Sequence, residues 1–121
     1  MPIVLPTPAY PPLFDVIVLS GRPVLAAPMT GSGDAAPALD LDHIDAALAA
    51  GAGAVLLTNP HNPTGPVFTA AELLALAEVV DRHGARVVAD EVHGPLAYPG
   101  HPFVPYASVS DAAAAHAVTV T

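Results

Sequence analysis

The sequence predicts an α/β fold, arranged as a partial three-layer αβα sandwich around a mostly parallel sheet. Two short apolar runs, at residues 54–58 and 86–90, end in polar residues, as strands buried on both faces can do. Between them, apolar side chains occupy the i, i+3, i+4 and i+7 positions of a helix packed on one side; they are Leu73, Leu76, Ala77 and Val80. A strand, a helix and a second strand in this order predict a βαβ unit, whose two strands run parallel.

Capping residues mark the ends of the predicted helices in this region. Asp40 is expected to cap the N-terminus of one helix, and Gly51 follows its end. Thr69 with Glu72 three residues later has the spacing of a capping box, and Gly84 ends that second helix. These signals separate the predicted helices from the strands that come after them.

The flanking regions are less regular. The region before residue 39 predicts a strand, a helix and a strand, at residues 3–5, about 11–19 and 24–26. After Gly94, a long helix is excluded by four prolines, at positions 95, 99, 102 and 105. We expect turns there, one helical turn near residues 107–111 and a last strand at 117–121, and we interpret the alanine stretches as compositional.

The composition excludes several classes of function. The chain has 121 residues, a net charge of −8 and only three basic side chains other than histidine, which are Arg22, Arg82 and Arg86. We therefore expect neither nucleic acid nor an anionic membrane surface as a partner. There is no cysteine, so disulfides and cysteine-ligated zinc are excluded.

The chain is expected to be cytoplasmic. The segment from Met1 to Pro6 lacks the positively charged region of a signal peptide, and prolines interrupt the residues after it. No apolar run approaches the roughly 18 residues of a membrane span. Small molecules and protein partners remain as the candidate partners.

Polar motifs follow the two central strands. Residues 59–65 read Asn-Pro-His-Asn-Pro-Thr-Gly, and residues 90–93 read Asp-Glu-Val-His. Asn62 lies just past one predicted strand and Asp90 at the carboxyl end of the next. Open α/β sheets bind ligands at this edge, so we expect the two side chains to converge there.

These motifs resemble the cofactor pocket of fold-type-I pyridoxal-phosphate enzymes, the aminotransferase class I/II superfamily. Together with residues 6–14 (Pro-Thr-Pro-Ala-Tyr-Pro-Pro-Leu-Phe) and 98–101 (Tyr-Pro-Gly-His), they are similar to the carbon–sulfur β-lyase, or cystathionine β-lyase, branch. Aminotransferases usually have tyrosine at the position of His93, so histidine favours the lyase branch. The resemblance implies β-elimination from cysteine conjugates to thiol, pyruvate and ammonia, with an aminotransferase as the alternative.

The resemblance also implies pyridoxal 5′-phosphate as cofactor and four residues that bind it. Asp90 would keep the ring nitrogen protonated, and Asn62 would donate to the phenolic oxygen, with a cis Asn62–Pro63 bond aiming its side chain. Tyr10 would stack on the pyridine ring, a contact worth about 1 kcal/mol beyond its buried area. His93 completes the set, whereas Glu91 is expected to point to the opposite face of the strand.

By this resemblance, residues 1–121 correspond to the central part of the cofactor-binding large domain, and we expect a fragment. The segment with the Schiff-base lysine and the C-terminal small domain have no counterpart here, and the chain contains no lysine. The intact family implies an amino-acid substrate and a homodimer. Because the lysine normally transfers the proton, we expect this chain to be inactive by itself.

Two further interpretations of the chain can be compared with the enzyme fragment. The chain could be a non-catalytic remnant or an interaction module that keeps the sheet without the cofactor. A metal site is the other, but the spacing of its candidate ligands is nonspecific; they are His61, Asp90, Glu91, His93 and His101. We therefore expect no metal site.

The absence of lysine makes a testable prediction about covalent attachment. When the 121-residue chain is incubated with pyridoxal phosphate and reduced with borohydride, no internal residue should carry the cofactor, because the only primary amine is at Met1. Peptide mass spectrometry measures this, with a lysine-containing enzyme of the same family as positive control. A modified internal residue would overturn the prediction.

Overall fold

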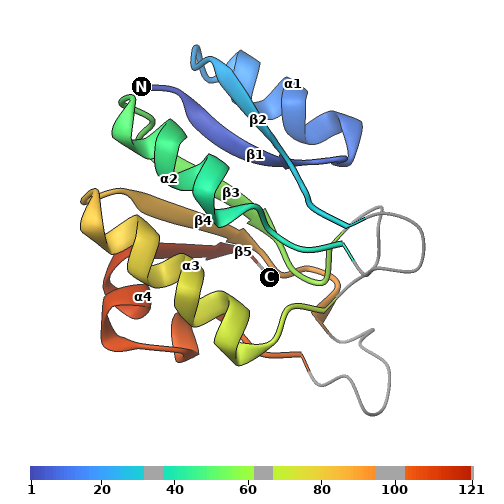
Figure 1. Cartoon of the computed structure of the whole chain (residues 1–121). Helices are drawn as coiled ribbons and strands as arrows, with labels where there is room; N and C mark the ends of the chain where they lie inside the picture. The colour runs from blue at the N-terminus through green and yellow to red at the C-terminus, as the bar shows by residue number, and fades with distance from the viewer. Residues whose placement is uncertain (32–36, 62–66, 95–102, 121) are drawn as a thin grey trace.

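The computed structural model describes residues 1–31, 37–61, 67–94 and 103–120, and these form three layers (Figure 1). The central layer is a sheet, with α1 on one face and α2, α3 and α4 on the other. The predicted αβα arrangement is therefore confirmed. The strands are β1 (Ile3–Thr7), β2 (Val24–Pro28), β3 (Ala54–Thr58), β4 (Arg86–Asp90) and β5 (Ala117–Val120). The helices are α1 (Pro11–Leu19), α2 (Leu41–Ala49), α3 (Ala70–Arg82) and α4 (Asp111–His116), with a short 3-10 helix η2 (Tyr106–Ser108).

The five strands of this sheet are all parallel, in the order β2-β1-β3-β4-β5. The β3–β4 register pairs Ala54 with Arg86 and Thr58 with Asp90. Because the strands are parallel, their carboxyl ends lie at one edge and their amino ends at the other. The loops after β1, β3 and β4 thus leave the sheet on the same side.

Alternating strand side chains build a separate core on each face of the sheet. Val55, Leu57 and Val87 pack with α2, α3 and α4 in the larger cluster. Leu56 and Val88 face the other way and join the cluster around Ile17 of α1. The central strands are buried on both sides, as their continuous apolar runs predict.

The predicted caps of α2 and α3 are confirmed. The Asp40 carboxylate accepts a hydrogen bond from the His43 amide at 3.1 Å. At α3, the Thr69 hydroxyl accepts from the Glu72 amide at 3.1 Å, and the Glu72 carboxylate accepts from the Thr69 amide at 3.4 Å, which completes the capping box. Each pair stabilises amides that lack a partner within the helix.

The C-terminal region differs from the prediction. The turn near 107–111 is the 3-10 helix η2, and it is followed by α4, which the sequence analysis missed. Ser110 caps α4, because its hydroxyl accepts from the Ala113 amide at 3.0 Å. The alanines after Asp111, interpreted as compositional, have high helix propensity and a cap in front of them.

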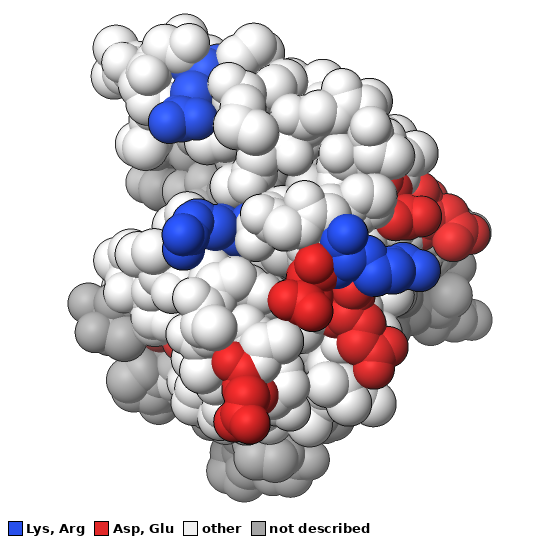
Figure 2. All heavy atoms as spheres, turned by 90° about the vertical axis from the view of Figure 1, so that its left-hand side faces the viewer, with Lys and Arg blue, Asp and Glu red and all other residues white. Residues whose placement is uncertain are grey.

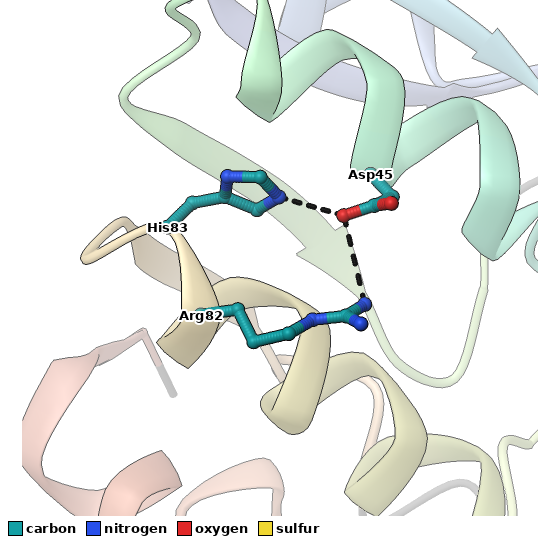
Figure 3. Close-up of polar contacts among 3 residues, drawn as sticks. All are labelled: Asp45, Arg82 and His83. Carbon is teal, nitrogen blue, oxygen red and sulfur yellow. Dashed lines mark hydrogen bonds and ion pairs between the residues drawn. The ribbon is translucent and has the colours of Figure 1, made fainter.

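An exposed polar contact joins α2 to the end of α3 (Figure 3). Asp45 lies 2.6 Å from the His83 Nε2 and 3.5 Å from the Arg82 guanidinium. The hydrogen bond from His83 lowers the pKa of the Asp45 carboxyl. Solvent screens this contact, so the apolar α2–α3 interface contributes more to holding the helices together.

Among the described residues, no helix is long and apolar enough to cross a membrane.

A buried pair of titratable side chains connects η2 to α4. The Tyr106 hydroxyl lies 2.6 Å from the His116 Nε2. Burial lowers the pKa of His116, Asp81 of α3 acts in the opposite direction, and Arg86 of β4 lowers it further. Burial also raises the pKa of the Tyr106 hydroxyl. The neutral imidazole is therefore the form that the folded chain favours.

This pair predicts a loss of stability in mild acid. Below about pH 6.5 the unfolded chain binds a proton on residue 116 more readily than the folded chain does. His116 should therefore lower the free energy of unfolding as pH falls, by at most about 1.4 kcal/mol per pH unit. Urea denaturation of the parent and His116→Gln chains between about pH 5 and pH 8 measures this.

The difference between the two chains isolates His116 from other groups. Glu91 acts in the opposite direction, because burial raises its pKa and its ionised form costs stability as pH rises. Glu91 is present in both chains and its contribution cancels. Identical pH dependences would contradict the prediction.

The face covered by α1 is incompletely protected. Val118 and Val120 of β5 are 53% and 48% exposed, and they follow Val88 onto that face by register. Leu19 of α1 is 85% exposed. Because β5 is also an edge strand in this sheet, its backbone can pair with another chain.

We therefore predict that the 121-residue chain self-associates or is marginally stable. Light scattering should show a mass that rises with concentration. Val118→Glu should shift the chain toward monomer, because a charge on an edge strand opposes pairing. The exposed change Glu78→Gln on α3 is the control. A monomeric parent with a cooperative transition of ordinary stability would contradict this prediction.

Candidate functional site

A pocket of about 420 Å³ opens at the carboxyl edge of the sheet, on the face that carries α1. It takes its walls from the ends of β3 and β4 and from the start of α1. Its lining includes three of the four predicted site residues: the lining residues are Tyr10, Leu13, Thr58, Asp90, Val92 and His93. This edge is where an open parallel sheet places its ligand sites.

Asp90 is the half-buried carboxylate of the pocket. It is the last residue of β4, and its Oδ1 accepts a hydrogen bond from the Val92 amide at 3.3 Å. Its carbonyl oxygen accepts from the Asn59 amide at 3.0 Å, which extends the β3–β4 ladder past the strand. The backbone on both sides of the carboxylate is therefore fixed, and the side chain faces the pocket.

Tyr10 and His93 lie at the mouth of the pocket. Tyr10 is the N-cap residue of α1, lines the pocket and is 50% exposed, so part of its side chain is accessible. His93 lies in the turn that follows Asp90 and is exposed. An aromatic ring and a carboxylate on the walls of one pocket suit a flat, cationic heteroaromatic ring.

The other predicted residues lie elsewhere. Asn62 falls outside the described part of the chain, as do the Asn62–Pro63 bond and His101. Glu91 points to the opposite face from Asp90, as expected, and its carboxylate accepts from the Tyr106 amide at 2.8 Å. Burial raises the pKa of Glu91.

Sequence reasoning missed several residues at this edge. Thr58 lines the pocket because the β3–β4 register pairs it with Asp90. Its place at the carboxyl end of the predicted strand was the sequence signal that could have identified it. Asn59 is completely buried: its side chain donates to the Val104 carbonyl and accepts from the Phe68 amide, both at 3.2 Å. No sequence signal marked Asn59 as more than a turn residue.

The positive charges lie at the other end of the sheet. Arg22 precedes β2, Arg82 ends α3 and Arg86 begins β4, so all three belong to the amino edge. Figure 2 shows that end of the molecule, where basic and acidic groups lie on a largely uncharged surface. Because these are the only lysine or arginine residues of the chain, none can balance a charge at the carboxyl edge.

The pocket therefore fits one part of pyridoxal phosphate. Asp90 and Tyr10 suit its protonated ring, whereas a phosphate would find no lysine or arginine from these 121 residues. No group of three or more potential metal ligands occurs among the described residues. Two of the candidate ligands have other partners, since Glu91 binds Tyr106 and His61 binds Pro8.

A second cavity, of about 300 Å³, lies between the first turns of α2 and α3. Glu72 is its one ionisable lining residue, and that carboxylate already caps α3. The lining is otherwise apolar: Ala38, Leu39, Leu41, Ala71 and Ala75. It offers no second polar group for catalysis, so the pocket at the carboxyl edge is the candidate site.

Comparisons with known proteins identify the family of the chain. The model of the family "Aminotransferase class I and II" matches residues 1–121. The cystathionine β-lyase of Corynebacterium glutamicum is 38% identical over 119 residues, which are 98% of this chain and 30% of that protein. The cystathionine β-lyase of Bacillus subtilis is 36% identical over 110 residues, 90% of this chain and 28% of that protein.

Solved structures show the same fold. A protein from Clostridium difficile 630 with bound pyridoxal phosphate has a TM-score of 0.92 at 26% identity, covering 98% of this chain and 30% of that one. N-Succinyldiaminopimelate aminotransferase from Mycobacterium tuberculosis has a TM-score of 0.89 at 30% identity, with the same coverages. The chain spans about 30% of the length of the curated relatives it matches. The chain belongs to the aminotransferase class I and II family, whose matched relatives and structural neighbours are pyridoxal-phosphate-dependent enzymes.

Proposed function

We propose that the pocket at the carboxyl edge of the sheet forms the wall that binds the cofactor ring in the active site of a pyridoxal-phosphate-dependent carbon–sulfur β-lyase. The observation that carries the proposal is the pocket in which Tyr10, Asp90 and His93 meet. The relatives named cystathionine β-lyase support the lyase class. The proposed reaction is β-elimination from a cysteine conjugate, which yields a thiol, pyruvate and ammonia.

Each residue of the pocket would contribute through its own chemistry. When bound, pyridoxal phosphate supplies the electron sink for bond breaking at a substrate carbon. Asp90 would hold a proton on the ring nitrogen, since a carboxylate in a partly dry pocket favours the cationic form. Tyr10 would hold the plane of the ring by stacking, and Asn62, Asp90 and His93 are proposed with it as the cofactor-binding set.

The lyase is favoured over an aminotransferase by His93. Its imidazole stands in the turn where a tyrosine is usual in aminotransferases, and it lines the pocket. An aminotransferase remains the second candidate, because the M. tuberculosis structure named above is one and shares the fold. Assays of an intact enzyme carrying this segment, for thiol release and for amino-group exchange with a 2-oxo acid, distinguish the two.

Several wider properties belong to the same proposal. The 121-residue chain would be inactive alone, because it has no lysine and its three arginines lie at the amino edge of the sheet. The intact protein would act on an amino acid as a homodimer, and we place it in the cytoplasm as the sequence predicts. Residues 1–121 would be the central part of its large domain.

Replacing the pocket carboxylate tests the role of Asp90. In an intact enzyme carrying this segment, Asp90→Asn should lower turnover by roughly 100-fold or more, because an amide cannot hold the ring proton against developing charge. The fold should persist, since the amide oxygen can still accept from Val92. Steady-state kinetics measures the loss.

The matched control is Glu91→Gln, which makes the same chemical change one residue away on the opposite face. Glutamine can still accept from the Tyr106 amide, so this variant should lose much less activity. Equal losses in both variants, or full activity in Asp90→Asn, would refute the assignment of Asp90.

A further inference from the structure

His61 connects two loops that border the pocket. Its Nε2 lies 2.7 Å from the carbonyl oxygen of Pro8, in the segment between β1 and α1. His61 itself belongs to the loop after β3, and its side chain is 4% exposed. We propose that His61 is a positioning residue, which holds the Tyr10 wall of the pocket at a fixed place relative to Asp90.

The contact defines the tautomer of the ring. A carbonyl oxygen only accepts hydrogen bonds, so the Nε2 of His61 must carry a hydrogen. In the neutral ring, Nδ1 then has a lone pair, and it is buried with no partner among the described residues.

The β3 side of this contact is rigid. The His61 ring packs edge-on against Phe68, with ring centroids 6.2 Å apart and an interplanar angle of 62°. Phe68 is buried, and its amide donates to the Asn59 side chain at 3.2 Å. The backbone amide of Asn59 in turn donates to the Asp90 carbonyl, so these contacts connect His61 to the end of β4 that carries the carboxylate.

The segment between β1 and α1 connects Pro8 to Tyr10. Pro8 lies two residues before Tyr10, and prolines at 6, 8, 11 and 12 fix φ along this segment. The Tyr10 carbonyl accepts from the Leu13 amide at 2.9 Å, which ties it to the first turn of α1. A hydrogen bond at Pro8 therefore acts on a stiff segment that ends at the pocket.

Two substitutions separate the hydrogen bond from the shape of the side chain. His61→Gln keeps an N–H donor at about the reach of Nε2, whereas His61→Phe keeps a ring and leaves the Pro8 carbonyl unpaired. His83→Gln is the control, because His83 binds Asp45 at the far end of α3.

The first measurement is the tautomer of His61 in the unchanged chain. Nitrogen-15 NMR of the labelled histidines should show hydrogen on Nε2 of His61, with the signal assigned by its loss in His61→Gln. Hydrogen on Nδ1 alone would overturn the proposal. This result stands even if His61→Phe does not fold.

The second measurement follows Tyr10 without any ligand. Fluorotyrosine is incorporated, and the fluorine-19 signal of Tyr10 is assigned with Tyr10→Phe. His61→Phe should shift or broaden this signal, whereas His61→Gln and His83→Gln should leave it near its parent position. A Tyr10 signal that is unchanged in His61→Phe, or equally changed in His61→Gln, would overturn the positioning role.

The link to the ligand rests on the proposed function and is tested separately. Pyridoxal phosphate, titrated without reduction, should bind His61→Phe about tenfold more weakly than His61→Gln, the ratio that about 1.4 kcal/mol gives. If no chain binds the cofactor but Tyr10 responds as stated, the ring-binding proposal fails and the positioning role stands. If the chains bind equally and Tyr10 does not respond, the positioning role fails alone.

Discussion

The parallel ladder between β3 and β4 is the constraint on which the site depends. It pairs Thr58 with Asp90, and the amide of Asn59 continues it by donating to the Asp90 carbonyl. Side chains of paired residues in a parallel sheet share a face, so the ladder also sends Thr58 and Asp90 to the side of α1. Slipping this register by one residue would turn the carboxylate away from the pocket.

The same alternation gives adjacent acidic residues different roles. Asp90 opens to the pocket, where a carboxylate can meet a cationic ring. Glu91 is buried on the other face and accepts the amide of Tyr106, which anchors the chain near η2. The carboxylate at the first position faces the pocket, and the buried acceptor at the second position supports packing.

The distribution of charge divides the sheet into two ends. All three arginines lie at the amino edge, and the candidate pocket at the carboxyl edge has an aspartate but no lysine or arginine. A ligand with a cationic ring suits this pocket, whereas a phosphate needs donors beyond its described lining. In the proposed function, this pocket would be one wall of a site that needs further groups, and the chain spans 30% of the length of the matched C. glutamicum relative.

The sequence by itself determined the layers, the central strands and two of the caps. Continuous apolar runs identify strands buried on both faces, and the pairs at Asp40 and Thr69 are local signals that span a single helical turn. The residue bounds expected for β3, β4 and α1 match those of the structure. By contrast, the sequence analysis missed α4. Its four alanines, at residues 112–115, form no amphipathic pattern, and the capping residue Ser110 was not identified.

Tertiary structure alone decided how the site is held together. Polar side chains at the ends of strands predict which edge of the sheet holds the site. The sequence cannot show that His61 contacts Pro8 or that Asn59 contacts Val104, because these partners are 53 and 45 residues apart. Such contacts arise only when parallel strands bring distant loops side by side. Local patterns fix elements over a few residues, whereas the pairing of buried polar groups depends on the packing of the entire chain.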